Sequence, residues 1–289
     1  MKIKELFNKK TVFSFEIFPP KKTSSVDVIY KTLEELGDLS PDFISVTFSA
    51  GGSGNGSLSC EIASKIKDVY HITPMLHLPC INYTKEEIVE VLNDLDARGI
   101  ENILALRGDI NPDIEPKKNF TYASDLIKFI KERGNYDVAG ACYPEGHVEA
   151  ESLTADILNL KKKVDMGADH LISQLFFDNS FFYDFREKAK IASINVPIEA
   201  GIMPVVNKNQ IERMVSMCGA SLPPKFTKIM QKYENKPDAL RDAGIAYAID
   251  QIVDLVSNGV DGIHLYTMNN PYVARRISEA VSGIIDSSK

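Results

Sequence analysis

The sequence contains no tryptophan, four cysteines, five histidines and no long hydrophobic run among its 289 residues. A membrane-spanning helix needs about 20 consecutive apolar residues, and no segment approaches that length. The histidines show no HExxH spacing, so a metal site is not predicted. The cysteines are widely spaced without a CxxC pair, which argues against a zinc site and a disulfide framework; they are Cys60, Cys80, Cys142 and Cys218.

The charge further restricts the class of protein. The formal net charge is -7 and no basic stripe is present, so nucleic acid is not an expected partner. The N-terminal segment "MKIKELFNKK" is charged but lacks the apolar stretch of a signal peptide. A hydrophobic content of 44% and a charged content of 25% are typical of a globular protein with a sizeable core. We therefore expect a cytoplasmic protein without a membrane partner.

Short strand-like runs alternate with longer helical patterns along the whole chain. In "TKEEIVEVLNDLDARG", Ile88, Leu92 and Leu95 share one helical stripe and Gly99 ends it. Eight strand–helix units favour a (β/α)8 TIM barrel formed by residues 1–289 as a single domain. A doubly wound sheet, the alternative, has fewer strands and a phosphate-binding glycine turn. An extra helix is expected at 222–237, and the strands are expected at 12–18, 43–48, 72–78, 102–106, 138–143, 170–177, 197–203 and 262–268.

Polar residues collect where these strands end, which is the edge of a barrel that carries catalytic groups. They are Glu16, Thr47, His77, Arg107, Gly108, Asp109, Tyr143, Gln174, Tyr266 and Thr267. Deeper on the same faces, the residues are small or apolar: Ser45, Met75, Ala105 and Ala141. Structural alternatives remain open, because Glu16 could pair with a basic residue and Arg107 with Asp109.

The glycine-rich segment "SAGGSGNGS" follows the second predicted strand. It lacks the GxGxxG spacing of a dinucleotide-binding turn, so a lip that contacts a ligand is the preferred interpretation. A loop without a binding role is the alternative.

Several motifs together resemble the methylenetetrahydrofolate reductase family. They are "FSFEIFPPK", "VTFSAGGS", "HLPCIN", "ALRGD", "YASDL", "YPEGHVEA", "DILNLKKKVDMGAD", "SQLFFD", "GIMPV" and "LYTMN", and they cover almost the whole chain. The resemblance implies a (β/α)8 barrel that holds FAD. It also implies hydride transfer from NADH or NADPH through FAD to 5,10-methylenetetrahydrofolate, as in the bacterial catalytic form without a regulatory domain.

The resemblance also implies roles for individual residues. Glu16 would be the general acid, and folate would contact Asp109, Gln174, Gln210 and Asn270. The implied flavin contacts are Thr47, His77, Leu106, Arg107, Gly108, Asp109, Tyr122, Ala141, Tyr143, His147, Asp156, Asn159, Lys162 and Lys163. Spacing is compatible with this assignment, because Asp156, Asn159 and Lys163 recur at i, i+3 and i+7 on one helix face.

The sequence departs from the family pattern at three positions. Asn270 stands where relatives commonly carry an arginine that would grip the folate carboxylates, although Arg275 and Arg276 follow. Met214 replaces a common aromatic residue that would stack on nicotinamide or pterin, and Ala200 replaces a proline.

The mechanism that these residues suggest uses two carboxylates. Glu16, at the end of an apolar strand, would protonate the departing nitrogen of the substrate. Asp109 would stay ionised beside Arg107 and stabilise the developing cation. Expected partners are folate, a nicotinamide, a second copy of the chain in a homo-oligomer and, as an alternative electron donor, an accessory electron-transfer subunit.

The sequence leaves three other functions open. A barrel aldolase or isomerase would use a Schiff-base lysine or a phosphate loop, and no lysine stands at a strand end. A folate-binding methyltransferase subunit would bind pterin without flavin, and a non-catalytic scaffold would not need a polar rim.

Overall fold

The computed structural model describes residues 1–20, 25–48, 56–110 and 115–288, without the side chains of 208–210 and 213. Most of the glycine-rich segment, 49–55, therefore lies outside the described residues. Within them, eight parallel strands pair in chain order and the first pairs with the last, which closes a barrel. The strands are β1 (Val12–Ile17), β2 (Phe43–Val46), β3 (Thr73–Pro79), β4 (Asn102–Leu106), β5 (Asp137–Cys142), β6 (His170–Ser173), β7 (Ile198–Ile202) and β8 (Gly262–Tyr266).

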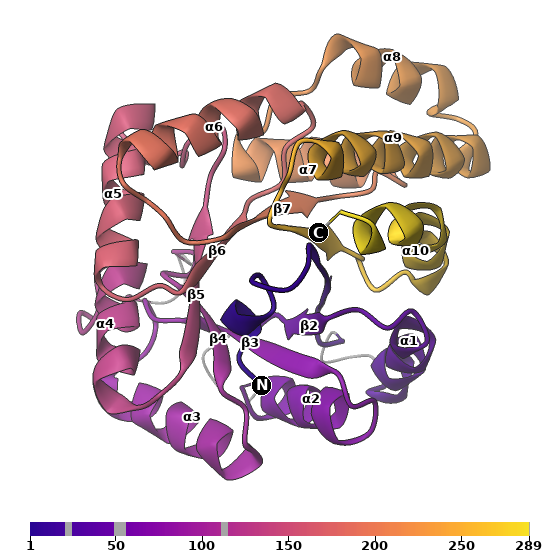
Figure 1. Ribbon diagram of the computed structural model, residues 1–289. Coiled ribbons are helices and arrows are strands. Elements are labelled where there is room, and N and C mark those ends of the chain that lie inside the picture. Colours follow the sequence, from indigo (N-terminus) through magenta and orange to yellow (C-terminus); the bar gives the residue numbers. More distant parts are fainter. Residues whose placement is uncertain (21–24, 49–55, 111–114, 289) are drawn as a thin grey trace.

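The helices surround this ring of strands, as Figure 1 shows, so the predicted (β/α)8 barrel is confirmed. They are α1 (Asp27–Gly37), α2 (Gly56–Asp68), α3 (Lys85–Arg98), α4 (Ala123–Arg133), α5 (Leu153–Asp165), α6 (Asn179–Ile191), α7 (Lys208–Cys218), α8 (Pro224–Tyr233), α9 (Pro237–Ser257) and α10 (Pro271–Asp286). Helix α8 confirms the extra helix that the sequence predicted between the seventh and eighth strands.

Local sequence signals explain where the helices begin and end. The Thr84 side chain accepts a hydrogen bond from the Glu87 amide, and Glu87 accepts one from the Thr84 amide, so this pair caps α3. Gly99 ends the same helix with φ 62°, a left-handed conformation that glycine adopts without strain. The predicted end of this helix is confirmed.

The barrel has two apolar layers with different contents. Inside the ring, a small cluster includes Phe43, Met75 and Leu104, and the N-terminal 3-10 helix (Ile3–Glu5) packs against it. In Figure 1 the N-terminal segment, in indigo, lies across the near opening of the ring. The larger cluster lies between the strands and the helices, and it contains Ala105. Ala105 therefore does not share the interior face with Met75, so that prediction was wrong.

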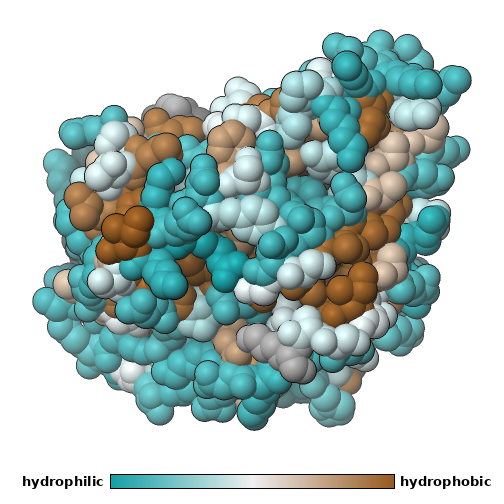
Figure 2. Space-filling model, turned by 45° about the horizontal axis from the view of Figure 1, so that its top comes forward, coloured by the Kyte–Doolittle hydropathy of each residue, from teal (hydrophilic) through white to brown (hydrophobic). Residues whose placement is uncertain are grey.

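No helix in the described part of the chain is long and apolar enough to cross a bilayer. On the face in Figure 2, hydrophilic residues predominate and hydrophobic residues form separate patches.

Candidate active site

Two adjacent pockets lie where β2 to β5 end. The larger has a volume of about 640 Å³ and extends toward the first turns of α4 and α5. The smaller has a volume of about 190 Å³, and the two share Ile81 and Leu106 as walls. Every residue with an implied flavin contact lines one of them. The larger pocket contains Leu106, Arg107, Tyr122, Ala141, Tyr143, His147, Asp156, Asn159, Lys162 and Lys163, and the smaller contains Thr47, His77, Leu106, Gly108 and Asp109.

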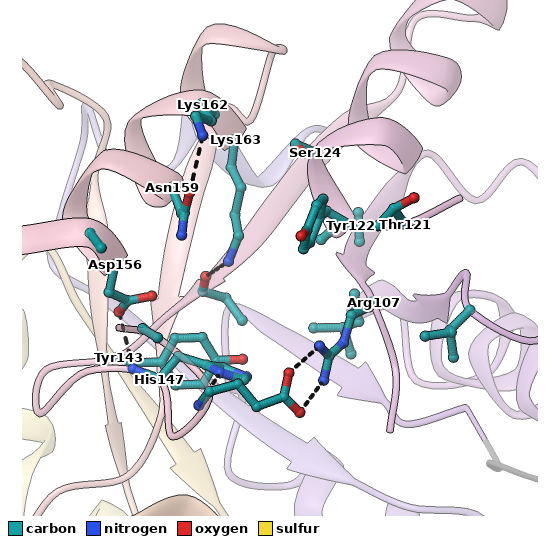
Figure 3. Close-up of a pocket in the computed structure, with 18 of the residues that line it drawn as sticks. Arg107, Thr121, Tyr122, Ser124, Tyr143, His147, Asp156, Asn159, Lys162 and Lys163 are labelled. Carbon is teal, nitrogen blue, oxygen red and sulfur yellow. Dashed lines mark hydrogen bonds and ion pairs between the residues drawn. The ribbon is translucent and has the colours of Figure 1, made fainter. Parts of the chain in front are cut away.

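One face of α5 presents charged and polar groups to the larger pocket (Figure 3). The Lys163 ammonium donates a hydrogen bond to the Ala141 carbonyl at 2.8 Å, which fixes its direction across the end of β5. Burial lowers the pKa of Lys163 and raises the pKa of Asp156. The Asp156 carboxylate accepts a hydrogen bond from the His147 amide at 3.2 Å, and the Asn159 carbonyl accepts one from Lys162. The predicted i, i+3, i+7 face therefore lines a cavity.

Arg107 lies on the opposite wall and binds Glu149. The two terminal guanidinium nitrogens of Arg107 are 2.5 and 2.9 Å from the Glu149 carboxylate oxygens (Figure 3). Among the described residues, Glu149 rather than Asp109 is the ion-pair partner of Arg107. The Arg107–Asp109 pair that the sequence left open is therefore not formed.

Glu16 points into the barrel mouth between two histidines. Its Oε2 atom lies 3.5 Å from Nε2 of His77 and 3.7 Å from Nε2 of His264. Burial lowers the pKa of His77 to about 4, so this imidazole is neutral at physiological pH. No lysine or arginine of the described chain lies within ion-pair distance of Glu16. Of the pairing with a basic residue that the sequence left open, the described part shows only the contacts with the two histidines, His77 and His264.

The smaller pocket lies between His77 and Asp109. His77, the neighbour of Glu16, forms one of its walls, and Asp109 and Gly108 form another. Gly108 has φ 88°, and a Cβ atom there would lie 3.0 Å from Cβ of Pro79. A glycine is therefore required for both the backbone conformation and the close packing at this wall.

The residues with an implied folate contact differ in what their side chains bind. The Gln174 side chain accepts a hydrogen bond from the Leu175 amide, and the Gln210 side chain lies outside the described residues. Asn270 caps α10, because its side-chain oxygen accepts a hydrogen bond from the Val273 amide at 3.2 Å. Met214 packs against an apolar cluster that joins α7, α8 and the end of β7.

The two arginines after Asn270 have other partners. Arg275 lies 3.5 Å from the Glu35 carbonyl and 3.9 Å from the Asp38 carboxylate, both at the end of α1. Arg276 donates a hydrogen bond to the Tyr272 hydroxyl. Both side chains are therefore engaged within the helical shell.

Sequence reasoning did not select His264 or Glu149. His264 is two residues from Tyr266 in β8, so strand alternation places both on the same face and could have indicated it. Glu149 belongs to the motif "YPEGHVEA", but no spacing rule predicts its contact with Arg107. The described residues contain no group of three or more histidine, cysteine or acidic side chains able to hold a metal ion.

The comparisons with known proteins identify the family of the chain. A family model described as methylenetetrahydrofolate reductase matches residues 2–282. The chain belongs to this family. It is 36% identical over 256 residues to the 5,10-methylenetetrahydrofolate reductase of Escherichia coli K12, covering 89% of this chain and 86% of the relative. The relative from Pectobacterium carotovorum is also 36% identical over 256 residues, with 89% and 85% covered.

A plant relative and a solved structure extend the comparison. The Arabidopsis thaliana protein named methylenetetrahydrofolate reductase (NADH) 1 is 35% identical over 295 residues, covering 97% of this chain and 50% of the longer relative. An uncharacterized Clostridium thermocellum protein, whose structure is described as binding two copies of 5-methyl-5,6,7,8-tetrahydrofolic acid, superposes with a TM-score of 0.67 at 14% identity. It covers 98% of this chain and 99% of its own, and at this identity it supports only the fold. Family membership makes the chain an oxidoreductase of folate one-carbon metabolism.

Proposed function

We propose that this protein reduces 5,10-methylenetetrahydrofolate to 5-methyltetrahydrofolate, with FAD as its resident cofactor and a reduced nicotinamide as its electron donor. The observation that carries the proposal is the pair of connected pockets, which the implied flavin residues line from Lys162 to Thr47. The pockets end at His77, 3.5 Å from the proposed acid Glu16.

The residues of the pockets fit a flavin dinucleotide chemically. Lys163 and Arg107 supply cations on facing walls for a diphosphate, while Asp156 and Asn159 offer polar atoms to hydroxyl groups. A side chain at Gly108 would crowd Pro79 and Ile81, which form walls of the smaller pocket. When bound, FAD supplies a centre that accepts hydride from nicotinamide and donates it to folate.

The residues at the mouth handle protons and charge. The methylene bridge of the substrate joins two nitrogens, and it becomes a good hydride acceptor only when one of them leaves. Glu16 donates a proton to the departing nitrogen, and Asp109 stabilises the positive charge that develops on the bridge. The neutral His77 lies beside the Glu16 carboxyl group without competing for its proton at physiological pH. The two carboxylates occupy different settings and take different roles.

The electron donor is proposed to be NADH. The support is the name of the Arabidopsis relative, which specifies NADH and matches 97% of this chain. NADPH and an accessory electron-transfer subunit are the alternatives that the experiment must separate.

An absorption spectrum of the purified protein tests the proposal. We expect a flavin spectrum, release of FAD rather than FMN on heating, and bleaching by NADH without oxygen. Adding 5,10-methylenetetrahydrofolate should restore the oxidised spectrum. A protein that stays colourless after reconstitution with FAD but binds folate would instead indicate a folate-binding methyltransferase subunit. Flavin that NADH and NADPH both fail to reduce would indicate a protein electron donor.

A further inference from the structure

The end of β1, which carries Glu16, is attached to the barrel on both sides. In the strand register, Glu16 pairs with Ser45 of β2 and with Tyr266 of β8. On the β2 side one further backbone bond follows, because the Thr47 amide donates to the Ile17 carbonyl at 3.0 Å. On the β8 side the strand ends at Tyr266, and side chains beyond it take the place of the ladder.

Two side chains that follow β8, those of Thr267 and Asn269, bind the β1 backbone. Oγ1 of Thr267 donates a hydrogen bond to the Glu16 carbonyl at 2.6 Å. The Asn269 side-chain oxygen accepts a hydrogen bond from the Phe18 amide at 3.1 Å, and its nitrogen donates one to the Phe18 carbonyl at 2.8 Å. Thr267 is buried and also accepts a hydrogen bond from the Asn269 amide at 3.2 Å. We refer to Thr267 and Asn269 as the β8 clamp.

The sequence after Glu16 explains why the clamp binds at Phe18. Pro19 and Pro20 have no amide hydrogen, so neither can donate a hydrogen bond to a neighbouring strand. The Phe18 amide is therefore the last backbone donor before the two prolines, and the Asn269 side chain accepts its hydrogen bond. The clamp thus fixes the chain at the point where strand pairing becomes impossible.

The backbone of the clamp adopts a conformation that is uncommon for residues other than glycine. Met268 has φ 51° and Asn269 has φ 53°, both in the left-handed region. Asparagine tolerates this region, whereas methionine adopts it at an energetic cost. The turn places the Met268 side chain against the apolar cluster of α7, α8 and the end of β7, and it brings the Asn269 side chain to Phe18. Strained residues of this kind collect at functional sites, where surrounding contacts hold them in place.

The Glu16 carboxyl group depends on this backbone for its position. Its distances to Nε2 of His77 and to Nε2 of His264, 3.5 and 3.7 Å, exceed the usual length of a hydrogen bond. These two contacts alone therefore do not fix the carboxyl group, and its place follows from that of the Glu16 backbone. A general acid must lie within hydrogen-bond reach of the atom that it protonates, and a displacement of about 1 Å can cost about a hundredfold in rate.

We propose that Thr267 and Asn269 are positioning residues that hold Glu16 at the place from which it protonates folate. This inference rests on the proposed function, because it concerns the acid of that reaction. The clamp binds the β1 backbone, whereas the Glu16 side chain reaches the substrate nitrogen. The clamp should therefore matter for flavin oxidation by methylenetetrahydrofolate. It should not matter for flavin reduction by NADH, which needs no acid.

The variant Asn269→Gly tests the clamp, because glycine adopts the left-handed backbone but removes both side-chain bonds to Phe18. Stopped-flow absorbance of the holoenzyme follows flavin reduction and flavin oxidation separately. We expect the limiting rate of flavin oxidation to fall about tenfold, while the half-saturating folate concentration and the rate of flavin reduction stay within about twofold of the wild type. Thr267→Val, which removes the hydroxyl group but keeps a similar shape, should have the same effect. Thr267→Ser keeps the hydroxyl group and should restore the rate.

Two further measurements separate positioning from a general loss of structure. If the clamp acts through Glu16, adding Asn269→Gly to Glu16→Gln should slow flavin oxidation no further than Glu16→Gln alone. Hydrogen exchange of the holoenzyme, read by mass spectrometry, should be faster at the Phe18 amide in Asn269→Gly. Asn179→Ala is the matched control, because Asn179 binds Gln251 through both atoms of its side-chain amide and so joins α6 to α9. It should change neither half-reaction.

Several outcomes would overturn this proposal. An Asn269→Gly variant with wild-type flavin oxidation, or with both half-reactions slowed equally, would reject the clamp, and so would a double variant slower than Glu16→Gln. A higher half-saturating folate concentration at an unchanged limiting rate would instead make Asn269 a direct folate contact. Each of these results leaves the proposed function intact. A wild type that does not reduce methylenetetrahydrofolate would reject the proposed function and the clamp together.

Discussion

Glu149 binds Arg107 through both terminal guanidinium nitrogens, at 2.5 and 2.9 Å, on the wall of the larger pocket. The Glu149 side chain is 53% exposed and that of Arg107 is 22% exposed, so the pair lies at the solvent edge of the pocket. The Arg107 guanidinium, which we propose contacts the flavin, is therefore neutralised in the structure by the Glu149 carboxylate.

Glu149→Gln should bind FAD more tightly. The substitution removes an anion that competes with the FAD diphosphate for Arg107, and an exposed ion pair contributes less than about 1 kcal/mol, which is up to about fivefold in Kd. Titration of the apoprotein with FAD, followed by fluorescence quenching, measures this change. Glu151→Gln, at another acidic residue of the same pocket, is the control for a general loss of negative charge. Equal effects of the two variants would show that Arg107 is not the site of competition.

Protonation of His77 should lower the stability of the fold in acid. Its pKa falls from 6.5 to about 4 on folding because of burial, so the unfolded chain takes up a proton before the folded protein does. The contribution of neutral His77 to the free energy of unfolding is complete above pH 6.5 and decreases as the pH falls toward 4. Its upper limit is about 3 kcal/mol, because one pKa unit corresponds to about 1.4 kcal/mol.

Urea unfolding at several pH values measures this effect through the difference between wild type and His77→Gln. We expect the difference in the free energy of unfolding to shrink between pH 6.5 and pH 4, the interval set by the two pKa values of His77. A difference that stays constant over this interval would show that folding does not lower the pKa of His77.

Asn270 should stabilise α10. Asn270→Ala removes the hydrogen bond to the Val273 amide and should lower the free energy of unfolding by about 1 kcal/mol, the usual value of an N-cap. Asn270→Ser keeps a capping oxygen and should restore most of this stability. The KM for folate, measured on the same variants, separates the cap from the predicted folate contact. A KM that rises in both variants while stability recovers in Asn270→Ser would support that contact.

The fold was predictable because the signals that set it are local. Alternation of strands and helices predicts a barrel, and Thr84, Glu87 and Gly99 fix the ends of α3 through short-range hydrogen bonds and backbone conformation. The face of Ala105 was not predictable in this way. Both faces of a parallel barrel strand are buried, so alternation does not distinguish the interior from the helical shell.

The part of the site that lies on a single helix, α5, was predictable. Asp156, Asn159 and Lys163 line a pocket together because they share one face of α5. The buried contacts among Ser14, Glu199 and His264, below Glu16, depend instead on segments that are distant in sequence. Ser14 meets Glu199 across 185 positions and His264 across 250, and only closure of the barrel brings them together. Sequence spacing carries no information on such contacts.

We propose that Glu16 provides the proton that opens the folate ring. Glu16→Gln keeps the shape of the side chain and its position beside His77, but it cannot donate a carboxyl proton. Hydride transfer from nicotinamide to flavin places no proton on a substrate nitrogen, so this half of the reaction does not need the acid. The variant should therefore fold and bind FAD like the wild type.

Stopped-flow absorbance of Glu16→Gln, with each half-reaction followed separately, is the most direct test. We expect flavin reduction by NADH within about tenfold of the wild-type rate and flavin oxidation by methylenetetrahydrofolate slowed by about a hundredfold or more, the scale of general acid catalysis. Equal slowing of both half-reactions would assign Glu16 a structural role, and unchanged flavin oxidation would contradict its role as the acid.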